Sequence, residues 1–540
     1  MSFRATIRQS SSIRKVNAAI VAQSVYDMVI KVAANLARST TVKTMNLINF
    51  RTWRTAAIAA VALIATTVAN VASANLMHVS TSGLGQVLLF PYYTTRNDTV
   101  SLLSLVNTSV QAKAVRINVR EARGGFVVAR LNVYLSAKDV WTAAIIADGD
   151  GAKLITNDTS CTAPLVGSGL AFDNASYAGT SNALPEALRS RDRTREGYLE
   201  VIEMAAIPNS TKTGVAVTHI AGRPSCASNG VKLTDAIYEP PAADLRVPAG
   251  QMTGTLSFVN VGQGMLASTA PTVLENFWRT DTAAAAPRVW AATASGPDLT
   301  TGGNRFVNLP RYNTDATVAS ESHYVAEFAS SIDAVSAVLT AKKVSTEYAF
   351  TKDGVIATQQ VTMLPTKPYY IFGIPTGPFQ TQWDVSSAQA CDVLALESFD
   401  REEFSSEPRD QFVPPLYPWN LMCYVANTLL IGVDGVLATP LGIRHYPIQN
   451  GVIEVIRPGR EGGWQELSFI APQAKFTAVS ASVVERKADV LTLTPVSLTV
   501  QGLPVIGFTM SRSAYKTGSP QQNFGDISPL RRETTYVEAR

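Results

Sequence analysis

The stretch Val115-Arg116-Ile117-Asn118-Val119-Arg120 decides the fold class, because apolar and polar residues alternate in it without a break. Alternation at every second residue is the pattern of a strand that buries one of its two faces. Gly124-Gly125 follows as a turn, and a second apolar run occupies residues 126–135. Two such runs joined by a short glycine-containing connection predict a β-hairpin.

The same pattern recurs on both sides of this hairpin. It predicts strands at Gln86–Phe90, Val100–Val106, Val140–Ala147, Tyr198–Met204, Met252–Val261, Val335–Leu339, Val452–Ile456 and Val496–Val500. Helix is expected only in short pieces, at Leu184–Arg191 and Thr272–Trp278. Many short strands with closely spaced turn signals are typical of sandwiches. We therefore expect an all-β fold of two or three β-sandwich-like domains, with little helix and with long loops tied by disulfides.

Breaks in the strand pattern predict the domain limits. Pro240-Pro241 cannot join the middle of a strand ladder, so we place a boundary near residue 248. The chain after Ser511 is polar and is expected to be loop. These breaks give an N-terminal β-sandwich domain at 75–248, a C-terminal β domain at 249–510 and a polar tail at 511–540.

Residues 45–74 have the three parts of a secretory signal peptide. Arg51 and Arg54 precede an apolar run at 56–71, which ends in the small-x-small sequence Ala72-Ser73-Ala74. The run is rich in alanine and falls short of the roughly 20 strongly apolar residues of a stable span. A Sec-type signal cleaved after Ala74 is therefore favoured over an uncleaved anchor. Residues 1–44 are interpreted as an extension from an upstream start codon, with a long signal region as the alternative.

Charge is distributed unevenly along the chain. Residues 1–74 hold nine of the 46 Lys and Arg residues and one of the 42 acidic residues, which leaves 37 basic and 41 acidic residues at 75–540. The basic balance of the whole chain is thus a property of its first 74 residues. It gives no reason to expect nucleic acid as a partner.

All four cysteines lie after the expected cleavage site. An even number of cysteines in an exported chain favours disulfides over free thiols. Order along the chain favours the pairs Cys161–Cys226 and Cys391–Cys423, although three pairings are possible. A four-cysteine zinc site is disfavoured because the sequence has no C-x-x-C motif.

One segment could hold a hard cation. Asp148 and Asp150, in the sequence Asp-Gly-Asp-Gly-Ala-Lys, together with Asp158, offer oxygen ligands of the kind that Ca²⁺ prefers. Ala152 and Lys153 occupy positions where an EF-hand needs a ligand and a glycine, so this is not that motif. The alternative is a glycine-rich turn whose aspartates bond to local backbone amides. Otherwise no cofactor is expected.

Three clusters of proline and aromatic residues are candidates for ligand binding. Exposed rings can stack on sugars or anchor a partner, whereas buried rings would plug the ends of a sandwich. The candidate residues are Tyr92, Tyr93, Tyr369, Tyr370, Tyr417 and Trp419.

No catalytic residue is predicted. The acidic cluster at 400–403 is interpreted as a solvated loop, because neighbours on one loop rarely face each other across a glycosidic bond. None of the four histidines lies in a metalloprotease motif, and no G-x-S-x-G sequence marks a nucleophile elbow.

A set of short stretches spans most of residues 75–540: Leu88–Tyr93, Asn97–Thr99, Val106–Thr108, Leu135–Thr142, Asp148–Lys153, Asn157–Cys161, Thr194–Met204, Leu364–Lys367, Phe399–Glu403, Met422–Tyr424 and Gly502–Phe508. Together these stretches resemble a family of exported proteobacterial proteins, sometimes labelled cell surface proteins, for which no activity is established. The resemblance implies an envelope or surface location and assigns no catalytic residue.

Together these features predict an exported cell-envelope or cell-surface protein with a structural, adhesive or assembly role and no catalytic activity. The alternatives are a secreted or periplasmic carbohydrate-binding protein and a hydrolase with a dispersed site. The expected partners are envelope or surface components, or glycans, and no transmembrane span is expected once the signal is removed. The expected location is the cell surface or the extracellular space, with the periplasm as the alternative.

Overall fold

The computed structural model describes residues 75–539, except 180–183, 281–286, 312–320, 352, 374–376, 380, 403–419, 432–436, 438, 446–460, 470–474, 488–489 and 515–522. The proposed signal peptide, the predicted strand at 452–456, Tyr417 and Trp419 lie outside the described residues. Within the described residues the chain is mainly antiparallel β-sheet, and two disulfides are present. The all-β prediction is therefore confirmed.

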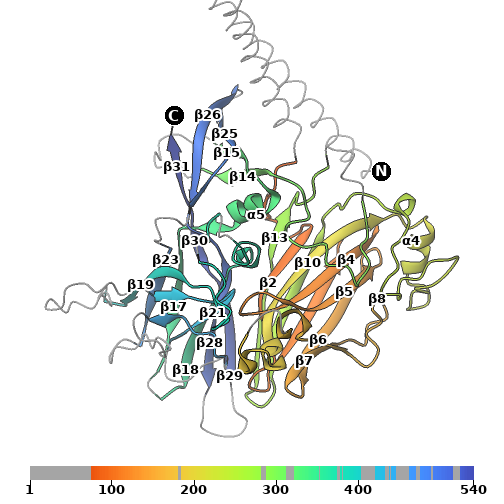
Figure 1. Ribbon diagram of the computed structural model, residues 1–540, viewed down its shortest axis with the longest axis horizontal. Coiled ribbons are helices and arrows are strands. Elements are labelled where there is room, and N and C mark those ends of the chain that lie inside the picture. The colour runs from red at the N-terminus through yellow and green to blue at the C-terminus, as the bar shows by residue number, and fades with distance from the viewer. Residues whose placement is uncertain are drawn as a thin grey trace, which may run out of the picture.

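The first half is a sandwich of two sheets, drawn in orange to green on the right of Figure 1. Its seven-stranded sheet has the order β1 (His78–Val79), β13 (Thr272–Glu275), β2 (Val87–Thr94), β10 (Glu196–Ile207), β4 (Ala112–Glu121), β5 (Val127–Leu135), β8 (Cys161–Ala163). Its six-stranded sheet has the order β12 (Met265–Thr269), β11 (Met252–Asn260), β3 (Val100–Asn107), β6 (Val140–Asp148), β7 (Gly151–Ile155), β9 (Leu170–Ala171).

The predicted hairpin forms as β4 and β5. Val115, Ile117 and Val119 are fully buried and belong to the apolar core, as the alternation requires. Gly125 turns the chain with a positive φ of 73°, and a Cβ atom there would lie 2.3 Å from Pro368 of the second half. Glycine is thus needed both for the turn and for the close contact.

The second half, on the left of Figure 1, contains smaller sheets. One has the order β14 (Phe306–Pro310), β15 (Glu321–Glu327), β25 (Ser480–Lys487), β26 (Val490–Gln501), β24 (Lys475–Thr477), and β31 (Thr535–Ala539) also pairs with β26. A second has the order β22 (Arg444–His445), β20 (Asn420–Met422), β19 (Asp392–Asp400), β23 (Gly462–Ser468), β17 (Lys343–Ala349), β30 (Arg531–Glu533). A third has the order β21 (Ala426–Ile431), β18 (Ile356–Met363), β28 (Ile506–Ala514), β29 (Asn523–Pro529), and β16 (Thr340–Ala341) pairs with β27 (Leu503–Pro504).

In the part of the chain that the structure describes, helical segments are short. The α-helices are α3 (Ala175–Ala178), α4 (Lys212–Val217) and α5 (Ser331–Leu339), and the 3-10 turns are η2 (Glu186–Leu188), η3 (Arg191–Arg195), η4 (Ala242–Asp244) and η6 (Lys367–Tyr369). Among the described residues no helix is long and apolar enough to span a membrane.

Three local predictions differ from the structure. The expected helix at Thr272–Trp278 is strand β13, and the expected helix at Leu184–Arg191 is replaced by the 3-10 turns η2 and η3. The expected strand at Val335–Leu339 is the end of α5, whose N-cap Ser330 accepts a hydrogen bond from the Asp333 amide. A short apolar run fits a buried strand and a buried helix equally well. The N-cap residue Ser330 is the local feature that distinguishes the helix here.

Strand pairing also moves the expected domain limits. β11, β12 and β13 lie after residue 248 but pair within the sheets of the first half, because β11 aligns with β3 from Met252 to Val259. The polar tail is not a loop, since β28 continues to Ala514 and β29, β30 and β31 follow. Polar residues suit these strands because one face of each is exposed to solvent.

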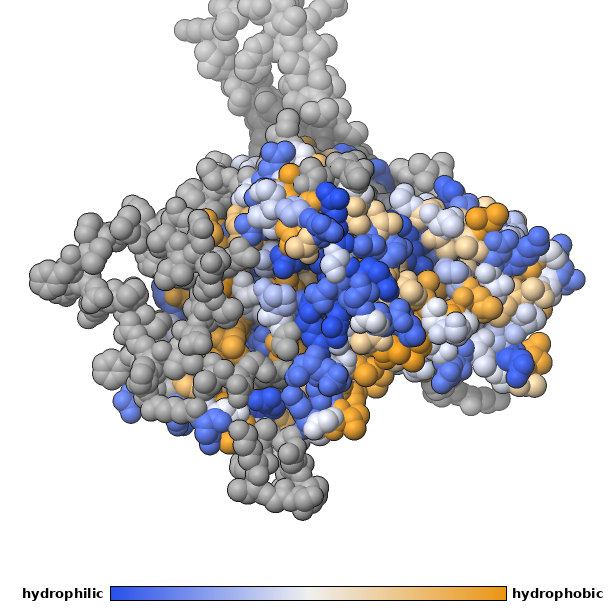
Figure 2. All heavy atoms as spheres, turned by 60° about the horizontal axis from the view of Figure 1, so that its bottom comes forward, coloured by the Kyte–Doolittle hydropathy of each residue, from blue (hydrophilic) through white to orange (hydrophobic). Residues whose placement is uncertain are grey.

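The two halves share one apolar core. Phe258 of β11 and Phe508 of β28 have ring centroids 5.7 Å apart and belong to the same cluster of buried residues. The backbone N–H of Val425 donates to the carbonyl of Ala122, which directly follows β4. On the face seen in Figure 2, a hydrophilic band runs down the middle of the molecule with apolar groups on its right.

Candidate functional site: a covered polar face and its pocket

The outer face of the seven-stranded sheet carries polar side chains that are not exposed. β4 supplies Arg116, Asn118 and Arg120, and the paired positions on β5 and β10 supply Arg130 and Glu200. Arg116, Asn118 and Glu200 are at most 1 % exposed. A face that the alternation marks as polar is therefore buried by another part of the chain. We call these five residues and Asn132 the polar face.

Residues 287–304, which we call the strap, cover the polar face. Arg116 donates to the carbonyl oxygens of Ala291, Ala292 and Gly296 at 2.7–2.9 Å. Asn118 donates to the Pro297 carbonyl at 2.9 Å, and Asn132 donates to the Trp290 carbonyl at 2.8 Å. Side chains of two strands thus hydrogen-bond to the backbone of an irregular segment and satisfy its buried carbonyls.

At one end of the polar face, an ion pair connects the two halves. The Nε of Arg120 lies 2.8 Å from Glu200, and the hydroxyl of Tyr369 donates to Glu200 at 3.1 Å. Arg120 also donates to the same hydroxyl at 2.7 Å. Burial raises the pKa of Glu200, and the charge of Arg120 opposes that rise. Because Tyr369 belongs to the second half, this network fixes the halves relative to each other.

The strap should respond directly to loss of its anchor. In Arg116→Met, three carbonyls lose a charged donor, at a cost of about 1.5–3 kcal/mol for such a bond. We expect amide hydrogen exchange in residues 287–304 to accelerate by about tenfold or more. Exchange in β3 should stay unchanged, and equal exchange of the strap in both proteins would contradict its anchoring by Arg116.

The four described tyrosines among the predicted ligand-binding residues are not exposed platforms. Tyr92 and Tyr93 are fully buried, and their hydroxyls donate to Glu196 and to the Thr194 carbonyl. Tyr370 is 6 % exposed and donates to Asp333, while Tyr369 bonds to Glu200. These contacts fit the alternative interpretation, in which the rings fill the interior of the sheets. For Tyr92 and Tyr93 the reason is that Pro91-Tyr92-Tyr93 continues strand β2 into the core.

The three aspartates of the predicted calcium site do not form a common ligand set. Asp148 pairs with Lys153 at 3.2 Å and with Arg191 at 3.3 Å, and Asp150 pairs with Arg191 at 3.1 Å. Asp158 instead accepts from the backbone amide and hydroxyl of Ser160. No group of three metal-binding side chains occurs among the described residues. Lys153 and Arg191 already neutralise Asp148 and Asp150.

Calcium is accordingly expected to leave the stability unchanged. Extracellular calcium modules bind in the range of about 0.1–1 mM, so about 5 mM Ca²⁺ would fill such a site. A filled site raises the midpoint of thermal unfolding by mass action. We expect identical midpoints in Ca²⁺ and in EDTA, measured by differential scanning calorimetry. A rise in Ca²⁺ that Asp148→Asn abolishes would restore the calcium hypothesis.

Both expected disulfides are formed. Cys161–Cys226 connects β8 to the segment after α4, and Cys391–Cys423 connects the residues next to β19 and β20. Beside the second bridge, Lys367 Nζ lies 2.7 Å from Asp392 Oδ2 and donates to the Met422 carbonyl at 3.1 Å. Burial lowers the pKa of Lys367 and raises that of Asp392, and each shift is opposed by the partner's charge.

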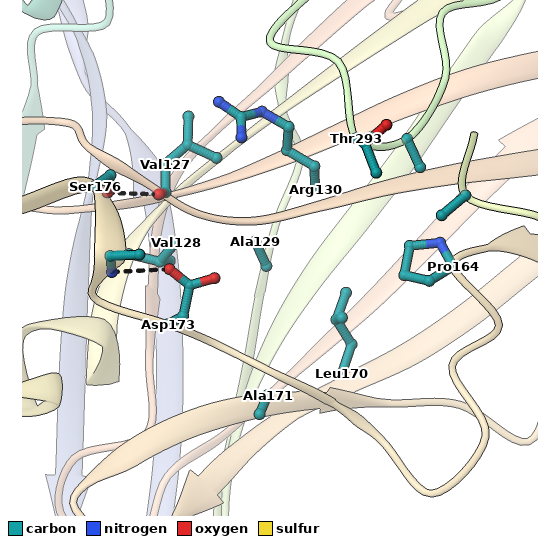
Figure 3. Close-up of a pocket in the computed structure, with 13 residues that line it drawn as sticks. Val127, Val128, Ala129, Arg130, Pro164, Leu170, Ala171, Asp173, Ser176 and Thr293 are labelled. Carbon is teal, nitrogen blue, oxygen red and sulfur yellow. Dashed lines mark hydrogen bonds between the residues drawn. The ribbon is translucent and has the colours of Figure 1, made fainter.

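A pocket opens beside the polar face at the edge of β5. Its volume is about 540 Å³, and Figure 3 shows Val127, Arg130, Leu170 and Thr293 around it. Segments from both sides of the sandwich form its walls: β5, the region around β9, and the strap. Sequence reasoning did not find this pocket, because Arg130 falls on the face that alternation assigns to solvent.

The chain matches no known family model, no curated protein and no solved structure, so its family is not identified by similarity.

Proposed function

We propose that this chain is an exported protein of the cell envelope or cell surface with a structural, adhesive or assembly role and without catalytic activity. The observation that carries the proposal is the position of the second disulfide. Cys391–Cys423 lies where the second half docks onto the first. Both cysteines belong to the second half, so the bridge stiffens the segment that contacts the first half. A crosslink at this place suits a protein that must keep its shape in an oxidising environment.

The residues that directly follow Cys423 reinforce this junction. Tyr424 follows Cys423, and its ring lies under the Arg123 guanidinium at 4.8 Å from the centroid. Val425 and Ala426 donate backbone hydrogen bonds to the Ala122 carbonyl at 2.9–3.0 Å. The bridge therefore holds in place the segment that contacts the β4–β5 turn. These contacts favour a rigid scaffold over two domains that move against each other.

The proposal that the chain is exported rests on other observations. Two disulfides indicate an oxidising compartment, and the sequence at 45–74 has the parts of a Sec-type signal. The resemblance to exported proteobacterial proteins points to the same location. Envelope or surface components are the partners that this location offers, with glycans as an alternative class.

Location can be tested by brief protease shaving of intact cells, followed by mass spectrometry of the released and the retained material. We expect peptides from Asn75 onward in the released fraction, while a cytosolic marker stays intact. Retained protein whose N-terminus is Met1 or Met45 would contradict signal cleavage. Protein freed only by disruption of the outer membrane would place the chain in the periplasm and contradict a surface role.

The role of the junction can be tested in the same preparation. In Cys391→Ser/Cys423→Ser the crosslink is absent while the core contacts remain. Closing a loop of 32 residues stabilises a folded chain by roughly 4 kcal/mol in the chain-entropy model. We expect faster proteolysis between the two halves, and unchanged proteolysis would mean that the bridge does not support a scaffold.

A further inference from the structure

The edge of β5 is only partly covered. β8 pairs with it at Asn132, Val133 and Tyr134, and nearer its start the Asp173 amide donates to the Val128 carbonyl. Backbone groups of residues two apart in a strand point the same way. The N–H and C=O of Arg130 therefore face this edge, in the gap between the two covering segments, and the pocket occupies that gap.

The walls of the pocket are mainly apolar. Val127, Pro164, Leu170 and Ala171 line it, and Figure 3 shows the Arg130 side chain on one side with Asp173 across from it. Ligand sites of this size combine apolar walls with a few polar groups that fix orientation. Among the lining residues, Arg130 is the strongest hydrogen-bond donor.

Arg130 lacks a carboxylate partner among the described residues. Asp173, Asp298 and Glu200 act on its charge, but none of them forms an ion pair with it, and its buried Nε has no hydrogen-bond partner. Glu200 is already engaged by Arg120. Arg130 is partly buried, so its charge is incompletely solvated.

The neighbouring Arg116 is a second arginine of the polar face without an ion pair among the described residues. The Arg116 guanidinium donates instead to backbone carbonyls of the strap. Burial lowers the pKa of Arg116 to about 10, and the charge of Arg130 adds to that effect. Arg116 pairs with Asn132 and Asn118 pairs with Arg130, so the two arginines are diagonal neighbours on the polar face. An anion in the pocket would relieve the repulsion between their charges.

We propose that this pocket binds a small organic anion with an apolar body, whose carboxylate pairs with the Arg130 guanidinium. A planar guanidinium binds a carboxylate through two parallel hydrogen bonds. The apolar body lies against Leu170, Pro164 and Ala171. Because the strap residue Thr293 also lines the pocket, the bound molecule contacts the segment that Arg116 anchors.

Titration calorimetry of the purified mature chain with hexanoate, hexanol and galacturonate tests each part of the proposal. Hexanoate carries both the charge and the apolar body, hexanol lacks the charge, and galacturonate replaces the apolar body by a sugar. We expect saturable binding of hexanoate, and binding of hexanol and galacturonate weaker by about tenfold or more.

Three variants locate the binding. Arg130→Gln removes the positive charge and should weaken the binding of hexanoate by about tenfold or more. Ala171 is exposed and lines the pocket. The larger side chain in Ala171→Phe should fill the pocket and prevent hexanoate from binding, although Arg130 is retained. Arg223→Gln removes an exposed arginine elsewhere and should bind as the parent does.

Each contrary result overturns a stated part of the proposal. Absence of saturable hexanoate binding at about 10 mM, or equal binding by the parent and Arg130→Gln, refutes the anion site. Stronger binding of galacturonate than of hexanoate refutes the apolar body and assigns the pocket to a sugar acid.

Discussion

Replacing Lys113 by Met is expected to lower the free energy of unfolding by about 3–5 kcal/mol, because it leaves a buried carboxylate without its cation. Lys113 Nζ lies 2.6 Å from Glu203 Oε1, and both side chains are fully buried inside the first sandwich. Glu203 also accepts from the amides of Ala249 and Gly250, which hold it in place when the cation is gone. Urea unfolding measures the loss.

The loss should depend on pH in a defined direction. Burial raises the pKa of Glu203, and Lys113 opposes that rise. Without Lys113 the folded-state pKa rises further above the unfolded value, so the folded variant binds more protons than the unfolded chain. Its stability is then retained below the unfolded pKa and is lost as pH rises through the folded pKa. The difference from the parent should be larger at pH 8 than at pH 5.

An exposed pair provides the control. Arg531 lies 2.7 Å from Glu347, with side chains 75 % and 71 % exposed. Arg531→Met should cost less than about 1 kcal/mol, because water screens such a pair. Equal losses for Lys113→Met and Arg531→Met would mean that the buried pair contributes no more than a surface one.

The second large effect is expected from Cys161→Ser/Cys226→Ser. The bridge closes a loop of 65 residues, for which the chain-entropy model gives roughly 4 kcal/mol. Without the bridge, the chain that follows residue 226 is no longer tied to β8. This chain includes Ala236, which lines the pocket and whose carbonyl accepts a hydrogen bond from the amide of the strap residue Thr293. We expect a lower unfolding midpoint together with faster hydrogen exchange in residues 218–240.

A comparison of the parent and the double variant under reducing conditions provides the control. Reducing agent should lower the midpoint of the parent protein but leave the double variant less affected, since only Cys391–Cys423 remains to be reduced. A midpoint of Cys161→Ser/Cys226→Ser equal to that of the oxidised parent would show that the buried contacts of β8 hold this loop without the bridge.

The strands were predictable because their signal is local. Alternation in β4 and the glycines after it are enough to place the first hairpin, and order along the chain favoured the observed disulfides. The boundary near residue 248 could not be predicted in this way. β11 pairs with β3 by the antiparallel ladder from Met252 to Val259, and no neighbouring residue in the sequence indicates that distant partner.

The polar face could not be predicted from the sequence for a related reason. Arg116, Asn118 and Arg120 are the residues that a strand pattern assigns to solvent, and only the position of the strap turns them into a buried layer. The tyrosines show the opposite situation. Tyr92 and Tyr93 have a polar tip that bonds inside the protein, so an aromatic residue after proline did not mean an exposed ring.

The order of the strands has a consequence for how the chain acquires its structure. His78 pairs with Glu275, and β2 has no partner in its sheet until β10 and β13 have been added. Contacts between residues so far apart form slowly, because a long loop must close first. The leading segment therefore stays unpaired while nearly 200 further residues emerge. Such late closure keeps the first strands of the sheet extended until most of the first half has been synthesised.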